Sequence, residues 1–136
     1  MAGVKLDTVR AGVKLLSGVL KAAESEVGNA NGRVTKTELR NIKDMYGDGG
    51  SLDAALTNIV KYAQAKYKVE SPSISQLNSA LADAMKNAAK ADTNKSDNLS
   101  PTEQKKLATT WKSIVDFAAD YKGTRVSDVI SPRGAP

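Results

Sequence analysis

Oxygen-bearing residues recur at alternate positions in one polar segment, residues 92–103. The positions with spacing suited to metal ligation are Asp92, Asn94, Ser96, Asn98, Ser100 and Glu103. A calcium ion takes about six to eight oxygen ligands at roughly 2.3–2.6 Å, and a tight loop supplies them from alternate residues, one main-chain carbonyl and a bidentate Glu. Asn98 stands where the main-chain carbonyl is needed, and Ser100 where a ligand can act through a water molecule. The spacing therefore predicts a calcium (Ca²⁺) site.

Helical patterns flank this segment on both sides. A capping box at 73–76 opens a helix predicted for 73–91, and a second capping box at 100–103, with Pro101 at the first helical position, opens a helix predicted for 100–122. The apolar positions predicted to face inward are Ile74, Leu77, Leu81, Met85 and Ala88 in the first of these helices, and Leu107, Trp111, Ile114, Val115, Ala118 and Tyr121 in the second. The loop is thus predicted to be held between two amphipathic helices.

This helix-loop-helix pattern over 73–122 resembles an EF-hand. The resemblance implies calcium ligation by the loop residues, and an apolar residue at the eighth place, Leu99, that faces the loop of a second hand. Two positions depart from the family pattern. Asp97 stands at the sixth place, normally Gly because the backbone is left-handed there, although Asp tolerates that conformation better than most residues. Gln104 follows Glu103, where the family usually has an apolar residue.

A plain structural interpretation competes with the metal site. Residues 92–98 would then be a polar interhelical loop, and 100–103 a common helix cap. A cap alone does not account for the alternating Asp, Asn and Ser upstream, or for Leu99 between the polar residues. We therefore favour metal binding.

An internal repeat predicts a second loop of the same kind. Sliding the chain so that Glu38 falls on Glu103 also aligns the apolar positions of the preceding helices, and it makes 27–38 the first loop. Its corresponding positions are Val27, Asn29, Asn31, Arg33, Thr35 and Glu38. Because Glu38 is its single carboxylate, we expect this degenerate loop to support the second one. A longer loop, 25–38, that relies on main-chain carbonyls is the alternative.

The resemblance also implies how the two loops meet. EF-hands usually pair through their eighth-place residues, which would bring Val34 against Leu99 in a short antiparallel contact. The helix predicted for 51–68 lies between the two hands. It could be a crossover between them, or it could fill the groove that sensor-type hands expose. The second possibility would make the protein a calcium buffer or a structural calcium protein more readily than a switch.

The remaining helix signals complete an all-α fold of paired EF-hand-like units. We predict further helices over 8–26 and 35–46, with Asp7 capping the first and Ser51 capping the helix at 51–68. The organisation predicted is one domain over 1–130, with 8–46 as the first hand, 51–68 as the intervening helix, 73–122 as the second hand, and 131–136 as a flexible tail.

Net charge raises the question of an anionic partner. The chain has 20 Lys and Arg against 15 Asp and Glu, a net charge of +5. The basic clusters singled out are Lys61, Lys66 and Lys68, and Lys105, Lys106 and Lys112. No aromatic residue is interleaved with them, so nucleic acid or an anionic membrane is disfavoured as a partner, and a protein partner stays open. The alternative function is a metal-independent helical module that binds an anionic partner through this basic surface.

Composition argues against catalysis. Cys and His are both absent, which excludes disulfides, thiol nucleophiles and Cys/His metal sites. We find no nucleophile–base pair and no phosphate-binding glycine motif, so we expect a protein that is not an enzyme. Residues 1–20 lack the uninterrupted apolar core of a signal peptide, which favours a soluble cytoplasmic protein.

Overall fold

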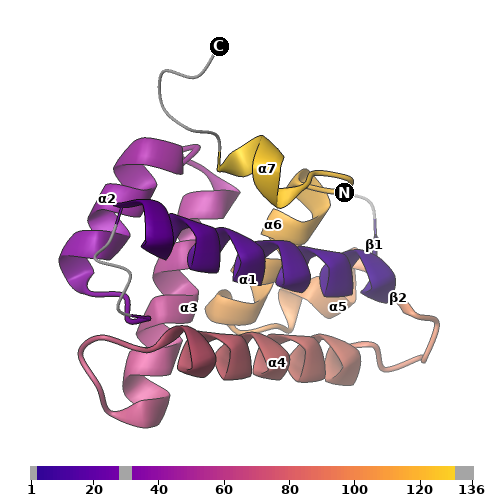
Figure 1. Ribbon diagram of the computed structural model, residues 1–136. Coiled ribbons are helices and arrows are strands. Elements are labelled where there is room, and N and C mark those ends of the chain that lie inside the picture. Colours follow the sequence, from indigo (N-terminus) through magenta and orange to yellow (C-terminus); the bar gives the residue numbers. More distant parts are fainter. Residues whose placement is uncertain (1–2, 28–31, 131–136) are drawn as a thin grey trace.

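Helices dominate the computed structural model, which describes residues 3–27 and 32–130 (Figure 1). In chain order the elements are β1 (Val4–Lys5), α1 (Leu6–Val27), α2 (Lys36–Tyr46), α3 (Ser51–Tyr67), α4 (Ile74–Ala91), β2 (Asn98–Leu99), α5 (Pro101–Lys105), α6 (Thr109–Asp120) and α7 (Val126–Val129). The predicted all-α fold is confirmed. The tail predicted for 131–136 lies outside the described residues. Across the described residues, no helix combines the length and apolarity that a membrane span requires.

Three helices begin at the capping boxes that the sequence predicts. Thr35 caps α2, Ser73 caps α4 and Ser100 caps α5, and in each case the cap side chain accepts a hydrogen bond from a main-chain N–H in the first turn. The Glu or Gln three residues later accepts a bond from the cap residue's own N–H in return. These reciprocal bonds satisfy N–H groups that a helix start otherwise leaves without partners.

Two predicted caps are wrong. Asp7 lies inside the first turn of α1, where it pairs with Arg10. Ser51 is already the first residue of α3, and its buried hydroxyl has no hydrogen-bond partner among the described residues. The carboxylate of Asp48 caps α3 instead, because it accepts from the N–H groups of Gly50, Leu52 and Asp53. A charged acceptor at this position also interacts favourably with the helix dipole.

The helix predicted for 100–122 is also wrong as a single element. It is broken between α5 and α6, where Ala108 has an extended backbone with ψ 155°. At this break, half-buried Leu107 packs against two clusters of buried apolar residues. One cluster includes Ile114, and the other includes Leu99 and Val115. The break redirects the chain, and α6 then packs along α1 and α3.

The core lies where four long helices meet. Most of the predicted inward positions are buried, among them Leu16, Leu56 and Ile114, which are 0% exposed. Four of them, Ile74, Met85, Leu107 and Tyr121, are half-buried. Figure 1 shows α1 and α4 lying alongside each other, with α3 and α6 running across them. The molecule thus has two similar halves, β1 to α3 and α4 to α6. The helix predicted as an extra one between the hands, α3, has a counterpart in α6.

Loop pairing differs from the prediction. Leu99 pairs with Val4 in the antiparallel β1–β2 ladder, and Val34 donates its N–H to the carbonyl of Pro72 at 2.8 Å. The predicted contact of Val34 with Leu99 is therefore wrong. The reason is that α1 and α4 run in opposite directions (Figure 1). The loop after each helix then lies beside the start of the other, so each loop pairs with the other half.

Candidate metal centre

The backbone of the second loop turns tightly around one carboxylate. Lys95 and Asp97 adopt left-handed conformations, with φ of 51° and 61°. Asp92, 6% exposed, ends α4 and points its carboxylate into the turn. Its Oδ1 accepts from the N–H of Ser96 at 3.1 Å, and its Oδ2 accepts from the N–H of Asp97 at 2.8 Å. These bonds fold the loop around Asp92.

Several of the predicted ligand oxygens lie close together. The Ser96 Oγ is 3.3 Å from Oδ1 of Asp92 and 3.0 Å from the carbonyl oxygen of Asn98. The Asn94 Oδ1 lies on the same turn and accepts from the N–H of Ser96 at 3.2 Å. Oxygens that share a calcium ion at about 2.3–2.6 Å are themselves about 3 Å apart. Oxygens of three predicted positions, Asp92, Ser96 and Asn98, thus have a spacing that suits a hard cation, and Asn94 lies on the same turn.

Glu103 and Ser100 are engaged differently. The Glu103 carboxylate is buried, and its Oε1 accepts from the N–H of Ser100 at 2.9 Å. Its Oε2 accepts from the N–H of Thr93 at 2.9 Å, and the Thr93 hydroxyl lies 3.2 Å away. The bond from Ser100 lowers the pKa of Glu103, and the bonds from Thr93 lower it further against the opposing effect of burial. Glu103 therefore closes the loop by joining its first turn to the start of α5.

The donor set is rich in oxygen but low in charge. Within the described part of the chain, no group of three or more acidic side chains converges as a metal cluster. The site would rely on the carboxylates of Asp92 and Glu103, one amide, one or two hydroxyls and a carbonyl. Such neutral oxygens fit calcium better than a transition metal, which prefers nitrogen or sulfur ligands.

The two departures from the EF-hand pattern both have structural roles. Asp97 takes the left-handed conformation that the resemblance implies for the sixth place of the loop. Gln104 is only 2% exposed, and its side-chain N–H donates to the carbonyl of Leu99 at 2.9 Å. A buried amide therefore holds the carbonyl of the last residue of β2, a contact that the sequence pattern did not indicate.

The first loop uses a carboxylate that the sequence alignment missed. Val27 is the last residue of α1, while Glu24, 4% exposed, accepts from the N–H of Gly32 at 3.3 Å. This bond corresponds to the one that the N–H of Asp97 donates to the carboxylate of Asp92 in the second loop. Glu24, and not Val27, thus stands in the place of Asp92. The sequence signal that could have identified this residue is a Glu on the buried face of α1, one turn before the helix ends.

The other predicted residues of the first loop are mostly structural. Thr35 and Glu38 form the cap of α2, with the N–H of Thr35 donating to Glu38 Oε1 at 3.0 Å. Arg33 bridges to Ser73 and donates from its guanidinium to the carbonyl of Ser71 at 3.2 Å. Asn29 and Asn31 lie outside the described residues. The described part of this loop therefore joins the two halves.

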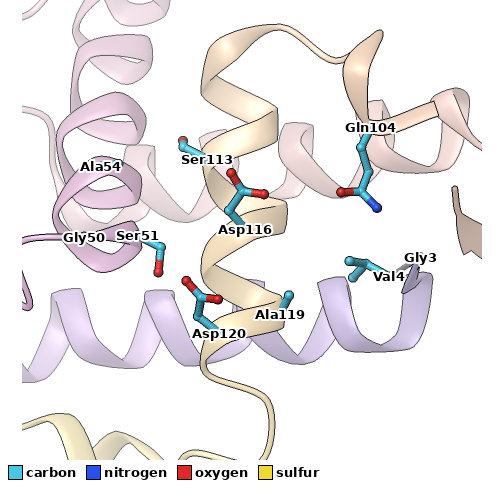
Figure 2. A pocket seen from close by; sticks show the side chains of 10 residues that line it. All are labelled: Gly3, Val4, Gly50, Ser51, Ala54, Gln104, Ser113, Asp116, Ala119 and Asp120. Atoms are coloured by element: carbon cyan, nitrogen blue, oxygen red, sulfur yellow. The ribbon is translucent and has the colours of Figure 1, made fainter. Parts of the chain in front are cut away.

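Figure 2 shows a cavity that adjoins the β1–β2 end of the second loop. It measures about 620 Å³ and lies between α3, α6 and the N-terminal strand. Figure 2 shows the side chains of Ser51, Asp116 and Asp120 around it. Asp116 already pairs with Lys112 at 3.0 Å. Neither Asp92 nor Glu103 lines this cavity, although Val4 and Gln104, which both contact Leu99, do.

Comparisons with protein-family models, with curated proteins and with solved structures gave no match to this chain. The resemblance to an EF-hand therefore rests on the residues and spacing of the chain itself.

Proposed function

We propose that this protein binds calcium through the loop 92–103. The observation that carries the proposal is the clustering of oxygens from Asp92, Ser96 and Asn98, with neighbouring atoms 3.0–3.3 Å apart. The left-handed backbone at Asp97 supports it, because this conformation is what the resemblance implies for a metal-binding turn. Asn94 adds an amide oxygen on the same turn.

Glu103 would complete the ligand set by changing partners. Its Oε2 now accepts from Thr93, so bidentate ligation requires that this bond be exchanged for the ion. Ser100 contributes through a water molecule in this proposal. With two carboxylates as the charged ligands, we expect a dissociation constant of roughly micromolar or weaker.

The apolar surface favours a buffer or structural role over a switch. Met45 is the one large hydrophobic side chain that is clearly exposed among the described residues, at 38%. The apolar faces of α3 and α6 are packed against each other and against α4, and α6 also packs against α1. A sensor would need such a face to open on calcium binding, and here opening would expose the core. Calcium is therefore expected to stabilise the domain.

A titration followed by amide NMR tests the proposal. Calcium should shift the amide signals of 92–103 at concentrations where magnesium does not, and Glu103→Gln and Asp92→Asn should each weaken binding by about tenfold or more. Glu38→Gln is the matched control, since it alters the equivalent cap in the other half and should leave the affinity of 92–103 nearly unchanged. Absence of any shift at millimolar calcium would refute the proposal.

A further inference from the structure

A groove runs between α2 and α3, next to the buried face of α2. From α2 it is lined by Lys36, Leu39, Arg40 and Lys43, which are spaced as one stripe of a helix. The buried residues of α2, Glu38 and Ile42, point elsewhere. Leu39 packs partly against the core from this stripe, whereas Lys36 and Arg40 are exposed.

The facing helix contributes a stripe with the same spacing. Val60 and Lys61 lie at its centre, and Thr57 and Gln64 lie one turn to either side. Lys43 is held across the groove, because its Nζ donates to Thr57 Oγ1 at 3.0 Å. The two helices thus form the walls of one preorganised site.

The rim of the groove is strongly basic. Lys36, Arg40 and Lys61 are exposed, and none of them forms an ion pair or hydrogen bond with a described residue. No carboxylate lines the groove among the described residues. Unneutralised cations around a concave surface attract anionic groups and raise their local concentration. The charge therefore selects an acidic partner.

The floor of the groove is apolar and narrows the choice of partner. Val60 is 2% exposed and Leu39 is half-buried, and the hollow above them measures about 280 Å³. This space accepts a large aliphatic or aromatic side chain. Nucleic acid is a poorer fit, because no aromatic ring lines the groove to stack on a base. An amphipathic peptide helix, by contrast, presents apolar anchors and charges on one face.

We propose that the α2–α3 groove binds an acidic amphipathic segment of a partner protein. An apolar side chain of that segment enters the hollow over Leu39 and Val60, and flanking carboxylates pair with Lys36, Arg40 and Lys61. The groove shares no residue with the loop 92–103, so its binding does not depend on calcium.

Fluorescence anisotropy with a labelled peptide, Glu-Glu-Leu-Glu-Glu-Leu-Glu-Glu, tests this proposal. The double variant Arg40→Glu/Lys61→Glu should weaken binding by about tenfold or more, since it places two repulsive charges on the rim. The matched control, Lys105→Glu/Lys106→Glu, changes the net charge equally on another surface and should alter binding less than about twofold. The milder pair Arg40→Gln/Lys61→Gln removes both positive charges without adding negative ones, so it tests the same site if the Glu variant misfolds. Circular dichroism of each variant verifies its helices.

Two further probes separate groove binding from general attraction to a basic protein. A peptide with Ser in place of both Leu should bind about tenfold more weakly, because the hollow loses its anchor. A single-stranded oligonucleotide of the same charge should bind without dependence on Arg40 or Lys61. The proposal is overturned if the Leu peptide does not bind at millimolar concentration, if both double variants weaken it equally, or if the Ser peptide binds as well.

Discussion

Asp97 holds a conformation that few side chains adopt. Its φ of 61° costs an ordinary L-residue about 1–2 kcal/mol, and Asp somewhat less. The side chain is exposed and forms no hydrogen bond with a described residue, whereas the main-chain N–H bonds to Asp92. Asp97→Gly keeps that N–H and removes the steric cost.

We therefore predict that Asp97→Gly raises the free energy of unfolding by about 0.5–1 kcal/mol, the gain being limited by the greater backbone entropy of Gly in the unfolded chain. Urea denaturation measures this. Ser96→Gly is the control, because Ser96 has no positive φ and loses its hydroxyl contacts, so it should destabilise. A decrease for Asp97→Gly would mean that its side chain stabilises the loop.

Glu103 links the loop to the pH dependence of stability. Hydrogen bonds from Ser100 and Thr93 favour its charged form and lower its pKa below the unfolded value of about 4.3. A carboxyl with a lowered folded pKa contributes stability that is fully present above the unfolded pKa. That stability is lost as the pH falls through the folded pKa.

The unfolding free energy should therefore fall from about pH 5 downward, and the fall should be shallower in Glu103→Gln. Urea denaturation between about pH 3 and pH 7 measures both curves. Asp48 and Asp83 also have lowered pKa values, so some acid dependence should remain in the variant. Identical slopes for the variant and the wild type would contradict the role given to Glu103.

At the scale of elements, local sequence signals predicted the helix starts and the buried faces. Features that depend on long-range contacts were not predicted. Thr35, Ser73 and Ser100 each carry a cap whose partners lie within three residues, so the sequence alone predicts these helix starts. Helical periodicity likewise predicts the buried faces, because the contacting stripe follows from the spacing alone.

The missed features depend on distant contacts or on competing caps. Leu99 pairs with Val4 because α1 and α4 are antiparallel, a relation that no local pattern encodes. Asp48, and not Ser51, caps α3. Asp48 lies before the helix, and its carboxylate accepts hydrogen bonds from several N–H groups, including those of Gly50 and Leu52. Glu24 was missed because α1 extends to Val27, the position aligned with Asp92, so the equivalent carboxylate lies inside the helix.

Two double-mutant cycles test whether each loop pairs with the other half and not with the other loop. Val4→Ala and Leu99→Ala should couple by about 0.2–1 kcal/mol, because the two residues are direct cross-strand neighbours. Val34→Ala and Leu99→Ala should be additive within about 0.5 kcal/mol, since these side chains belong to different apolar clusters. Unfolding free energies of the single and double variants decide the matter, and the reverse result would restore the pairing of one loop with the other.

At the scale of the whole molecule, the two halves form one folding unit. The most extensive helix contacts all join one half to the other: α3 with α6, α1 with α6, α1 with α4, and α3 with α4. Both loops also pair across the halves, Leu99 with Val4 and Val34 with Pro72. Neither half alone can cover its apolar faces.

Cutting the chain after Lys68 should therefore yield fragments 1–68 and 69–136 that are largely unfolded separately and regain helix when mixed in equal amounts. Lys68 is a suitable cut site because it is exposed and ends α3 in a left-handed conformation. Circular dichroism follows the helix, and size-exclusion chromatography follows the complex. Ile114→Asp in the second fragment should abolish recovery, because it places a charge in the fully buried face of α6. Cooperative melting of fragment 1–68 alone would show instead that each half is an independent domain. The contacts of Leu99 with Val4 and of Val34 with Pro72 would then join two domains, because the halves would not share one core.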